Sequence, residues 1–583
     1  MYYDLTVKIP DAPGKIIRKK KGSVTYILFE YGRDYKPDRQ YCIPKRAIIG
    51  KLAGSDADLM HPNEQFEVYF PGNSLPEELP EAYRSSCLRI GSHIVIRKVL
   101  EEYNLPGLLE KQFGEKHKLA MDLIAYLIVS EENVGQHYPD FAYDHPLFSK
   151  GMRIYSDSTV SRFLSSISLP QMQGFLNDWN KKRDKTQRIY LSYDSTNKNC
   201  EAGDIDLVEY GKPKDDLGYP IFNVSVAYDS TNRVPLFYEE YPGSITDVSQ
   251  LPYVVDKVKD YGYENVGFIL DRGYFSKDNI TYMDQNGCAF LIMIKGRRSL
   301  VSSLVSSVHG TFETDRKCSI RSYKVYGTTV KAPLYEDDTK ERYIHIYFNP
   351  GKCGSERESV EERIEKLRKH IESREGKIAT LGRPYTDYFD IHYSRKGELL
   401  YATERSDVVQ AELERCGYFC IASSEEMTAS EALIRYKGRD VSEKLFQADK
   451  TFIGSGSMRS HSEENLSARI FIEFIALIVR NRIYNLLKET MLRLEARPNY
   501  LTVPAALREL EKIEIVKGAK DIYRMPYAVT RKQKIILSSF GLDADSVKAS
   551  AKAMSDLLAK SGTTNDRQEQ EEDDGTYEDS CFD

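Results

Sequence analysis

The chain is poor in the features that mark secreted, disulfide-bonded or membrane-spanning proteins. Its nine cysteines contain no pair at Cys-x-x-Cys spacing, and the two closest, Cys416 and Cys420, read as buried thiols around a strand. The N-terminus has no apolar core of the kind that a signal peptide needs. The longest apolar run, residues 470–479, is too short to span a bilayer and contains Glu473. These absences predict a soluble protein of a reducing cytosol, without disulfides or a zinc site.

Positive charge is also in deficit, since the formal net charge is −6 at pH 7. Overall charge therefore does not indicate a nucleic-acid binder, but a protein of several domains can place a basic groove beside acidic surfaces. Tryptophan occurs once, as Trp179. The 583 residues, 41% of them hydrophobic, are enough for about three or four domains with cores of their own.

The N-terminal third changes from strand-like to helical patterns. Residues 23–31 and 66–70 alternate as strands do, which predicts a β-rich module over 1–93, and 73–86 reads as a linker. From 94 to 187 the apolar spacing is helical, and we expect a helical DNA-binding region there.

One segment of this helical region has the pattern of a helix-turn-helix element. Ser156 is a candidate N-cap, and Val160, Phe163, Leu164 and Ile167 follow at helical spacing. Thr159 and Arg162 would then point outward, either toward DNA or as the solvent face of an ordinary amphipathic helix. The basic stretch 180–188 is compatible with a DNA-facing linker or with a solvated loop.

The middle of the chain has the element order of an RNase H-like core. We expect five strands, with a helix between the fourth and the fifth, in a mixed sheet covered by helices. The fold class is therefore α/β, with a mostly β insertion before the core resumes near the strand 417–424. The strands are expected at 188–197, 222–230, 234–243, 266–274 and 289–294.

Further helices are expected in the second half. Residues 359–373 pair glutamates with basic residues at i, i+4, which indicates an exposed scaffold helix, and 463–495 should pack across the core. Residues 530–542 suit either a second DNA contact or a dimer element, although an ordinary helix fits as well. The domains are then 1–93 (β-rich), 94–187 (helical), 188–296 (core, first part), 297–416 (insertion), 417–495 (core, second part), 496–562 (helical) and 563–583 (disordered acidic tail).

The most informative motif consists of Tyr436, Arg439, Glu443 and Lys450. If the segment is one helix, as a capping box of Thr428 and Glu431 suggests, these side chains fall within about 60° of one another on one face. A carboxylate beside a phenol and two cations suits a metal ion next to a nucleic-acid phosphate. In its spacing the motif resembles that of cut-and-paste DDE transposases of the insertion-sequence-four superfamily, the Tyr-Arg-Glu-Lys group.

The resemblance requires two upstream aspartates on strands. The pentapeptide YDSTN occurs at 193–197 and again at 228–232. Asp229 lies at a turn between two strands, a common place for aspartate, whereas Asp194 ends the apolar strand after the basic linker, so we choose Asp194. For the second aspartate, Asp271 ends an apolar strand and is followed by Arg272 and a glycine, as the family places it.

The resemblance implies the chemistry. Asp194, Asp271 and Glu443 would hold two Mg²⁺ or Mn²⁺ ions, which prefer carboxylate oxygens. The same resemblance implies that Tyr436, Arg439, Lys450 and Arg272 contact DNA phosphates, and that the enzyme acts as a homodimer on the paired inverted-repeat ends of a prokaryotic element, at the nucleoid.

Two other functions stay open at this point. One is a metal-dependent nuclease of the same fold that cuts without joining, and the other is a DNA-binding protein derived from a transposase. A DNA-hairpin intermediate is a further open question, because relatives stack a flipped base on tryptophan and Trp179 precedes the core.

Overall fold

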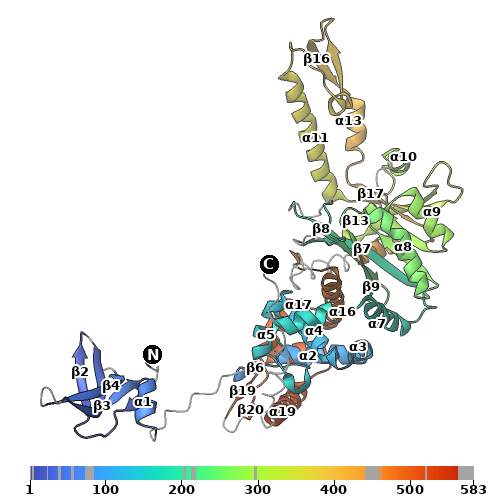
Figure 1. The fold of residues 1–583 in the computed structure, drawn as a ribbon. Helices are drawn as coiled ribbons and strands as arrows, with labels where there is room; N and C mark the ends of the chain where they lie inside the picture. Colours follow the sequence, from blue (N-terminus) through green and yellow to red (C-terminus); the bar gives the residue numbers. More distant parts are fainter. Residues whose placement is uncertain are drawn as a thin grey trace. The chain divides into compact units, whose positions relative to one another are not determined.

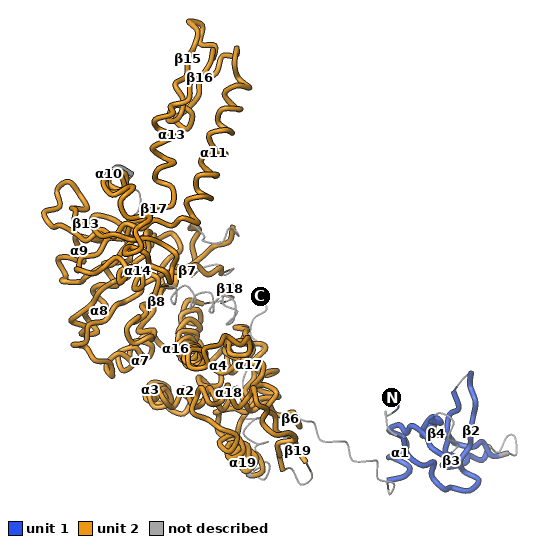
Figure 2. Tube along the Cα trace, turned by 180° about the vertical axis from the view of Figure 1, so that it is seen from behind, with its two compact units in different colours: residues 1–83 blue, residues 84–583 orange. Residues whose placement is uncertain are grey.

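The chain divides into two compact units, residues 1–83 and 84–583 (Figure 2). The structure is a computed structural model that describes residues 2, 6–22, 24–36, 41–53, 58–71, 84–200, 205–211, 218–294, 298–439, 457–458, 460, 462–518 and 522–561.

The first unit is an antiparallel sheet with one short helix. Its five strands follow the order β1-β5-β4-β3-β2. Their bounds are β1 Val7–Lys8, β2 Ile16–Lys21, β3 Val24–Lys36, β4 Tyr41–Leu52 and β5 Leu59–Pro62. The β-rich character expected for this part of the chain is confirmed.

The strand predicted at 66–70 is wrong, because this segment belongs to helix α1, Glu64–Tyr69. The Asn63 side chain accepts a hydrogen bond from the Gln65 backbone N–H and caps the helix, and Glu64 and Glu67 stand in the first turn, where acidic groups are favoured. Phe66 is buried against Ile27, Ile49 and Met60, so the apolar residues of this segment pack at helical spacing.

The second unit begins with the expected helices. They are α2 Gly91–Glu102, α3 Leu105–Phe113, α4 His117–Ser130, α5 Tyr138–Asp144, α6 Asp157–Ser165 and α7 Leu169–Lys181. The N-cap at Ser156 is confirmed, since its side chain accepts from the Thr159 N–H at the start of α6. Val160, Phe163 and Leu164 are buried on one face of α6, and Arg162 is exposed on the other.

A ten-stranded mixed sheet forms the centre of this unit (Figure 1). The order is β12-β13-β14-β17-β11-β10-β7-β8-β9, and β18 pairs with β7. The bounds are β7 Ile189–Cys200, β8 Ile221–Asp229, β9 Val234–Pro242, β10 Val266–Leu270, β11 Ala289–Met293, β12 Ser319–Ile320, β13 Val325–Ala332, β14 Arg342–Phe348, β17 Tyr418–Ser423 and β18 Ser457–Met458.

The five strands predicted for the core are confirmed in order and kind. β7, β8 and β9 form an antiparallel meander, β10 pairs parallel with β7, and β11 pairs parallel with β10. Helix α9, Lys277–Gln285, joins β10 to β11 as expected. Helix α8, Asp247–Asp260, was not expected; its interior contains Pro252, a residue that disfavours this position.

The insertion is mixed, so the prediction of a mostly β insertion is wrong. Its longest element is helix α11, Pro350–Glu372, and β13 and β14 extend the central sheet beyond β17. A separate small core joins α11 to the β15–β16 hairpin and α13 through Val360, Ile364, Phe389 and Leu399. The remaining elements are α10 Arg298–Val308, α12 Arg383–Thr386, β15 Phe389–Tyr393, β16 Leu399–Glu404 and α13 Ser406–Leu413.

Helix α16, Glu463–Arg493, packs across the core as predicted and contacts β9, α4 and α6. The last helices share a core with the first ones, because β19 pairs with β6, Cys87–Arg89, which directly precedes α2. The remaining elements are α14 Ala429–Gly438, α17 Val503–Leu510, β19 Glu514–Lys517, β20 Tyr523–Arg524, α18 Arg531–Ser538 and α19 Ala544–Ser561. The acidic tail 563–583 lies outside the described residues.

Candidate active site

Two adjacent parallel strands bring Asp194 and Asp271 together. In the register of β7 and β10, Leu270 pairs with Tyr193, so the next residues along both strands are the two aspartates. Because side chains alternate along a strand, Asp271 points to the same face as Ile269. Ile269 packs in a cluster with Leu433 and Tyr436 of α14, and α14 therefore covers the face that carries both carboxylates.

Asp194 lies inside β7 and not at its end, which corrects the prediction. The strand continues to Cys200 because the polar residues after Asp194 keep their ladder with β8, as in the pair Asn197 and Asn223. A position within a central strand, flanked by β8 and β10, holds the Asp194 backbone more firmly than a strand end would.

Tyr436 and Arg439 both reach the aspartate pair. The Tyr436 hydroxyl donates a hydrogen bond of 3.3 Å to Asp271 Oδ1. The Arg439 guanidinium lies 3.8 Å from Asp194 Oδ2 and 3.8 Å from Asp271 Oδ1. The two carboxylates thus share one cation, which offsets the repulsion between like charges at this edge of the sheet.

The partial exposure of the two aspartates and Arg439, and the protonation of Tyr436, suit a site that binds an anion next to a cation. The Asp271 side chain is 38% exposed, whereas those of Asp194 and Arg439 are 19% and 15% exposed. Burial, together with the neighbouring Asp271 charge, raises the pKa of Tyr436 despite the opposing effect of Arg439. The phenol therefore stays protonated at neutral pH and acts as a hydrogen-bond donor.

Helix α14 supplies Tyr436, and its start matches the prediction. Thr428 and Glu431 form the expected capping box. The helix ends at Gly438, with Arg439 as its C-cap residue. The described residues therefore do not form the single helix that was predicted to carry all four motif positions. Glu443 and Lys450 lie outside the described residues.

The segment after Asp271 is open toward solvent. Arg272 begins the short 3₁₀ helix η5, Arg272–Tyr274, and is exposed. A Cβ at Gly273 would meet no atom within 4 Å, so the space beside this loop residue is open.

The second YDSTN copy has a structural role. Asp229 is buried at the end of β8, and its Oδ1 accepts hydrogen bonds from the backbone N–H groups of Thr231 and Asn232. Its other oxygen accepts from the Asn232 side chain. Because Asp229 pairs with Leu191 on β7, it lies three positions, or about 10 Å, along the strand from the partner of Asp194.

The opposite face of β7 carries a network that the sequence did not suggest. The Ser195 hydroxyl donates to Asp247 Oδ1 at 2.6 Å, and the Tyr241 hydroxyl donates to the same oxygen at 2.8 Å. Asp247 stands in the first turn of α8. This network ties β7, at the residue next to Asp194, to β9 and α8.

A second unpredicted cluster extends along the α14 face. The Arg435 guanidinium lies 4.4 Å from the centre of the Tyr190 ring, and the Tyr190 hydroxyl donates to Glu425, which also binds Arg188. The neighbouring strand position is Gly267, where a Cβ would come within 2.8 Å of the Tyr190 ring. Glycine thus permits the ring to lie flat over β10. Spacing alone gave no signal for this cluster, because it joins residues far apart in sequence.

The basic stretch 180–188 is packed in part against the core. Arg183 lies 4.1 Å from the Trp179 ring centre and Lys185 lies 3.7 Å from that of Tyr263. Burial, with the nearby Arg183 charge, lowers the pKa of Lys185 to about 8. Trp179 is itself buried, and its indole N–H donates to the Pro235 carbonyl.

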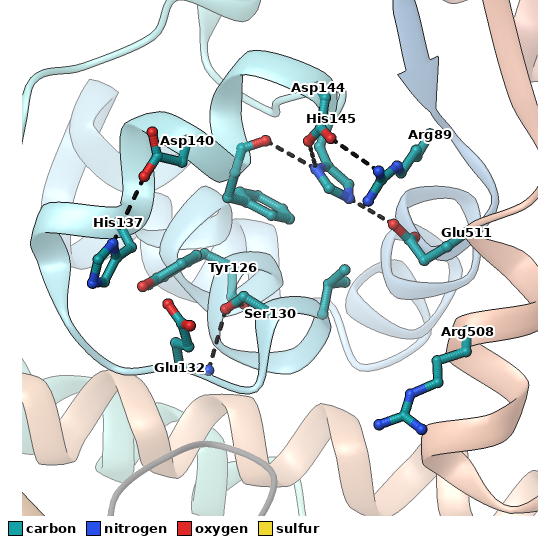
Figure 3. Close-up of a pocket in the computed structure, with 12 residues that line it drawn as sticks. Arg89, Tyr126, Ser130, Glu132, His137, Asp140, Asp144, His145, Arg508 and Glu511 are labelled. Carbon is teal, nitrogen blue, oxygen red and sulfur yellow. Dashed lines mark hydrogen bonds and ion pairs between the residues drawn. The ribbon is translucent and has the colours of Figure 1, made fainter.

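The helical region holds a separate pocket of about 520 Å³ (Figure 3). Figure 3 shows His145 at its wall, between Asp144 and Glu511. Each carboxylate lies 2.6 Å from one nitrogen of the ring. Burial alone would lower the pKa of His145, but these two acidic partners outweigh it and raise the pKa to about 9. The imidazolium therefore clamps α5 to the end of α17.

Asp194 and Asp271 supply two of the three acidic groups predicted for a metal site. Within the described ranges, no group of three histidine, cysteine or acidic side chains converges on one point. The same ranges contain no helix whose length and apolar character would let it cross a membrane.

Comparisons with known proteins bear on the central sheet. Residues 191–479 match the family model described as the transposase DDE domain. No curated protein matched the chain. Among solved structures, the chain is similar to that titled "Cryo-EM structure of piggyBac transposase synaptic complex with hairpin DNA (SNHP)", at 8% identity and a TM-score of 0.31. That alignment covers 72% of this chain and 64% of the other. The family match makes residues 191–479 similar to a transposase DDE domain, and these residues include both Asp194 and Asp271.

Proposed function

We propose that this protein is the transposase of an insertion sequence, which binds terminal inverted repeats and catalyses cut-and-paste DNA transposition. The observation that carries the proposal is the convergence of Asp194, Asp271, Tyr436 and Arg439 at one edge of a mixed sheet, within the matched DDE domain. The strand order β9-β8-β7-β10-β11 supports an RNase H-like catalytic core.

The aspartate pair suits a divalent cation. Both carboxylates face the same side of the sheet, both are partly exposed, and Mg²⁺ or Mn²⁺ prefers such oxygens. We assign Asp194, Asp271 and Glu443 as ligands of two such ions. When bound, these ions would activate the attacking hydroxyl and stabilise the leaving oxygen of an in-line phosphoryl transfer.

The remaining side chains would hold and orient the DNA backbone. Arg439 presents a planar fork of donors and Tyr436 a protonated hydroxyl, both suited to phosphate oxygens. Phosphate binding would draw Arg439 away from one or both carboxylates, which its 3.8 Å contacts permit. Arg272, exposed beside the open space at Gly273, and Lys450 complete the proposed phosphate contacts.

A homodimer on paired DNA ends, in the prokaryotic cytoplasm at the nucleoid, follows from the family resemblance and is proposed on that basis alone. Burial of Trp179 makes this side chain a poor platform for a flipped base. A hairpin step, if used, therefore needs another aromatic group.

The test is a reaction of the purified protein with labelled DNA that carries the element's own ends. Wild type should nick and then join these ends to a target plasmid when Mg²⁺ is present. Glu443→Gln should bind the ends equally well and neither cut nor join. A Glu443→Gln protein that still nicks would remove Glu443 from the site.

The rival functions give different products in the same assay. A nuclease of the same fold would cut the ends but leave pre-cleaved ends unjoined. A transposase-derived DNA-binding protein would bind the ends and do neither. The intact aspartate pair favours an enzyme over the DNA-binding protein, and the joining of pre-cleaved ends separates the transposase from the nuclease.

A further inference from the structure

The edge strand of the N-terminal unit ends in four consecutive cations. Residues Arg18–Lys21 of β2 are all exposed, and among the described strands β2 pairs with β3 alone. Side chains alternate along a strand, so Arg18 and Lys20 extend to one side of the β2–β3 hairpin and Lys19 and Lys21 to the other. The hairpin is therefore positively charged on both sides.

In the pairing register of the described residues, no acidic group of β3 stands opposite these cations. The residues of β3 that pair with Arg18–Lys21 are Ile27, Tyr26, Thr25 and Val24, none of which carries a charge at neutral pH. Among the residues that the structure describes, none forms an ion pair with Lys19, Lys20 or Lys21. The unit neutralises other cations, because Arg33 and Arg46 both contact Glu30, and Lys45 contacts Asp34.

The positive row continues across the sheet on one side. Lys19 pairs with Tyr26, and Tyr26 pairs on its other edge with Lys51 of β4. The Lys51 ammonium lies 5.4 Å from the centre of the Tyr2 ring. Cations interleaved with aromatic rings on one sheet surface are typical of nucleic-acid contacts.

Lysines on an edge strand also prevent pairing with other sheets. That role does not require a cation at every position from Arg18 to Lys21, nor on both sides of the hairpin. An exposed edge strand with cations on both of its sides, backed by the paired strand β3, instead suits a row of DNA phosphates.

We infer that the free edge of β2 runs along the phosphate backbone of double-stranded DNA and contacts it through Arg18–Lys21. The inference rests on the proposed function for the identity of the partner. The test of this inference measures DNA binding without cleavage. The inference can therefore fail while the proposed catalytic site stands, and the catalytic site can fail while the inference stands.

The experiment compares full-length wild type with the triple variant Lys19→Ser/Lys20→Ser/Lys21→Ser. Binding to a fluorescent 30-base-pair duplex is followed by anisotropy in EDTA over a range of salt concentrations. Each phosphate contact contributes about 0.9 to the slope of log K against log salt, so the variant should lose up to about 2.7 of the slope. Its affinity at low salt should fall by at least tenfold.

Two further variants serve as controls. The triple Lys→Arg variant at the same positions keeps the charge and should keep the slope. Lys352→Ser/Lys366→Ser/Lys369→Ser removes three exposed lysines of α11 that each lie near a glutamate one turn away, and it should also bind as wild type does.

Three results would overturn the inference. The first is an unchanged slope and affinity in the folded Lys19→Ser/Lys20→Ser/Lys21→Ser protein. The second is aggregation of this variant with full affinity in the soluble fraction, which would assign the lysines to edge protection. The third is an equal loss of affinity for a single-stranded probe of the same length, which would mean that the lysines do not recognise the duplex.

Discussion

The clamp at His145 makes local stability depend on pH. A pKa raised from the usual histidine value of 6.5 to about 9 corresponds to about 3 kcal/mol, because each pKa unit represents about 1.36 kcal/mol. The folded-state pKa is the higher one, so this stabilisation is fully present below pH 6.5 and is lost as the pH rises through about 9. The clamp joins α5 to the end of α17, where Glu511 is the C-cap residue.

The perturbation is His145→Gln, which keeps a polar side chain but cannot carry the charge. Hydrogen exchange of peptides from α5 and α17, corrected for intrinsic rates, measures the free energy of local opening between pH 6 and 10. Wild type should exceed the variant by up to about 3 kcal/mol at pH 6, and the difference should shrink as the pH passes 9.

A matched control is His137→Gln on the same pocket (Figure 3). His137 lies 3.7 Å from Asp140, but both side chains are exposed, and an exposed pair contributes at most about 1 kcal/mol. The reasoning is refuted if wild type and His145→Gln have the same pH dependence, or if His137→Gln changes it as much.

Three further variants test the structural roles assigned above. Asp229→Asn should still cleave DNA and should lose only about 1 kcal/mol of stability, because the asparagine oxygen can still accept the two backbone hydrogen bonds of the turn. An Asp229→Asn protein that folds and binds DNA but does not cleave it would reverse the choice of Asp194. Trp179→Phe should destabilise the fold by about 1–3 kcal/mol, because the Pro235 carbonyl loses its donor, and should leave the cleavage products unchanged on a sequencing gel. Lys198→Met breaks a buried ion pair with Glu473 and should lower the free energy of unfolding in denaturant by about 3–5 kcal/mol. The double variant with Glu473→Leu should lose less than the sum of the two single-variant losses, and strict additivity of these losses would contradict the coupling.

Local signals explain what could be predicted about the fold. Alternating apolar residues identified the five core strands, and the caps at Ser156 and Thr428 were readable because a capping side chain acts within three residues. Helix α8 was not predicted, and it contains Pro252, a residue that disfavours a helix interior. Helix α1 was missed because the alternation over 66–70 fits a strand equally well over so few residues.

The site was predictable only in part, for a related reason. Asp194 and Asp271 could be selected because each follows a run of apolar strand residues, and the parallel register of β7 and β10 then places them side by side. The pairing of Arg435 with Tyr190 depends on contacts between distant segments, as does the buried ion pair of Lys198. Single-sequence patterns contain no record of such contacts.

The central claim is that Asp194 and Asp271 bind a divalent cation together. Mn²⁺ binding, measured by the loss of the free-ion EPR signal in a titration of the full-length protein without DNA, tests it most directly. Asp194→Asn and Asp271→Asn should each weaken binding by at least tenfold, whereas Asp229→Asn should bind Mn²⁺ as wild type does. Unchanged Mn²⁺ affinity in folded Asp194→Asn and Asp271→Asn proteins would contradict the account.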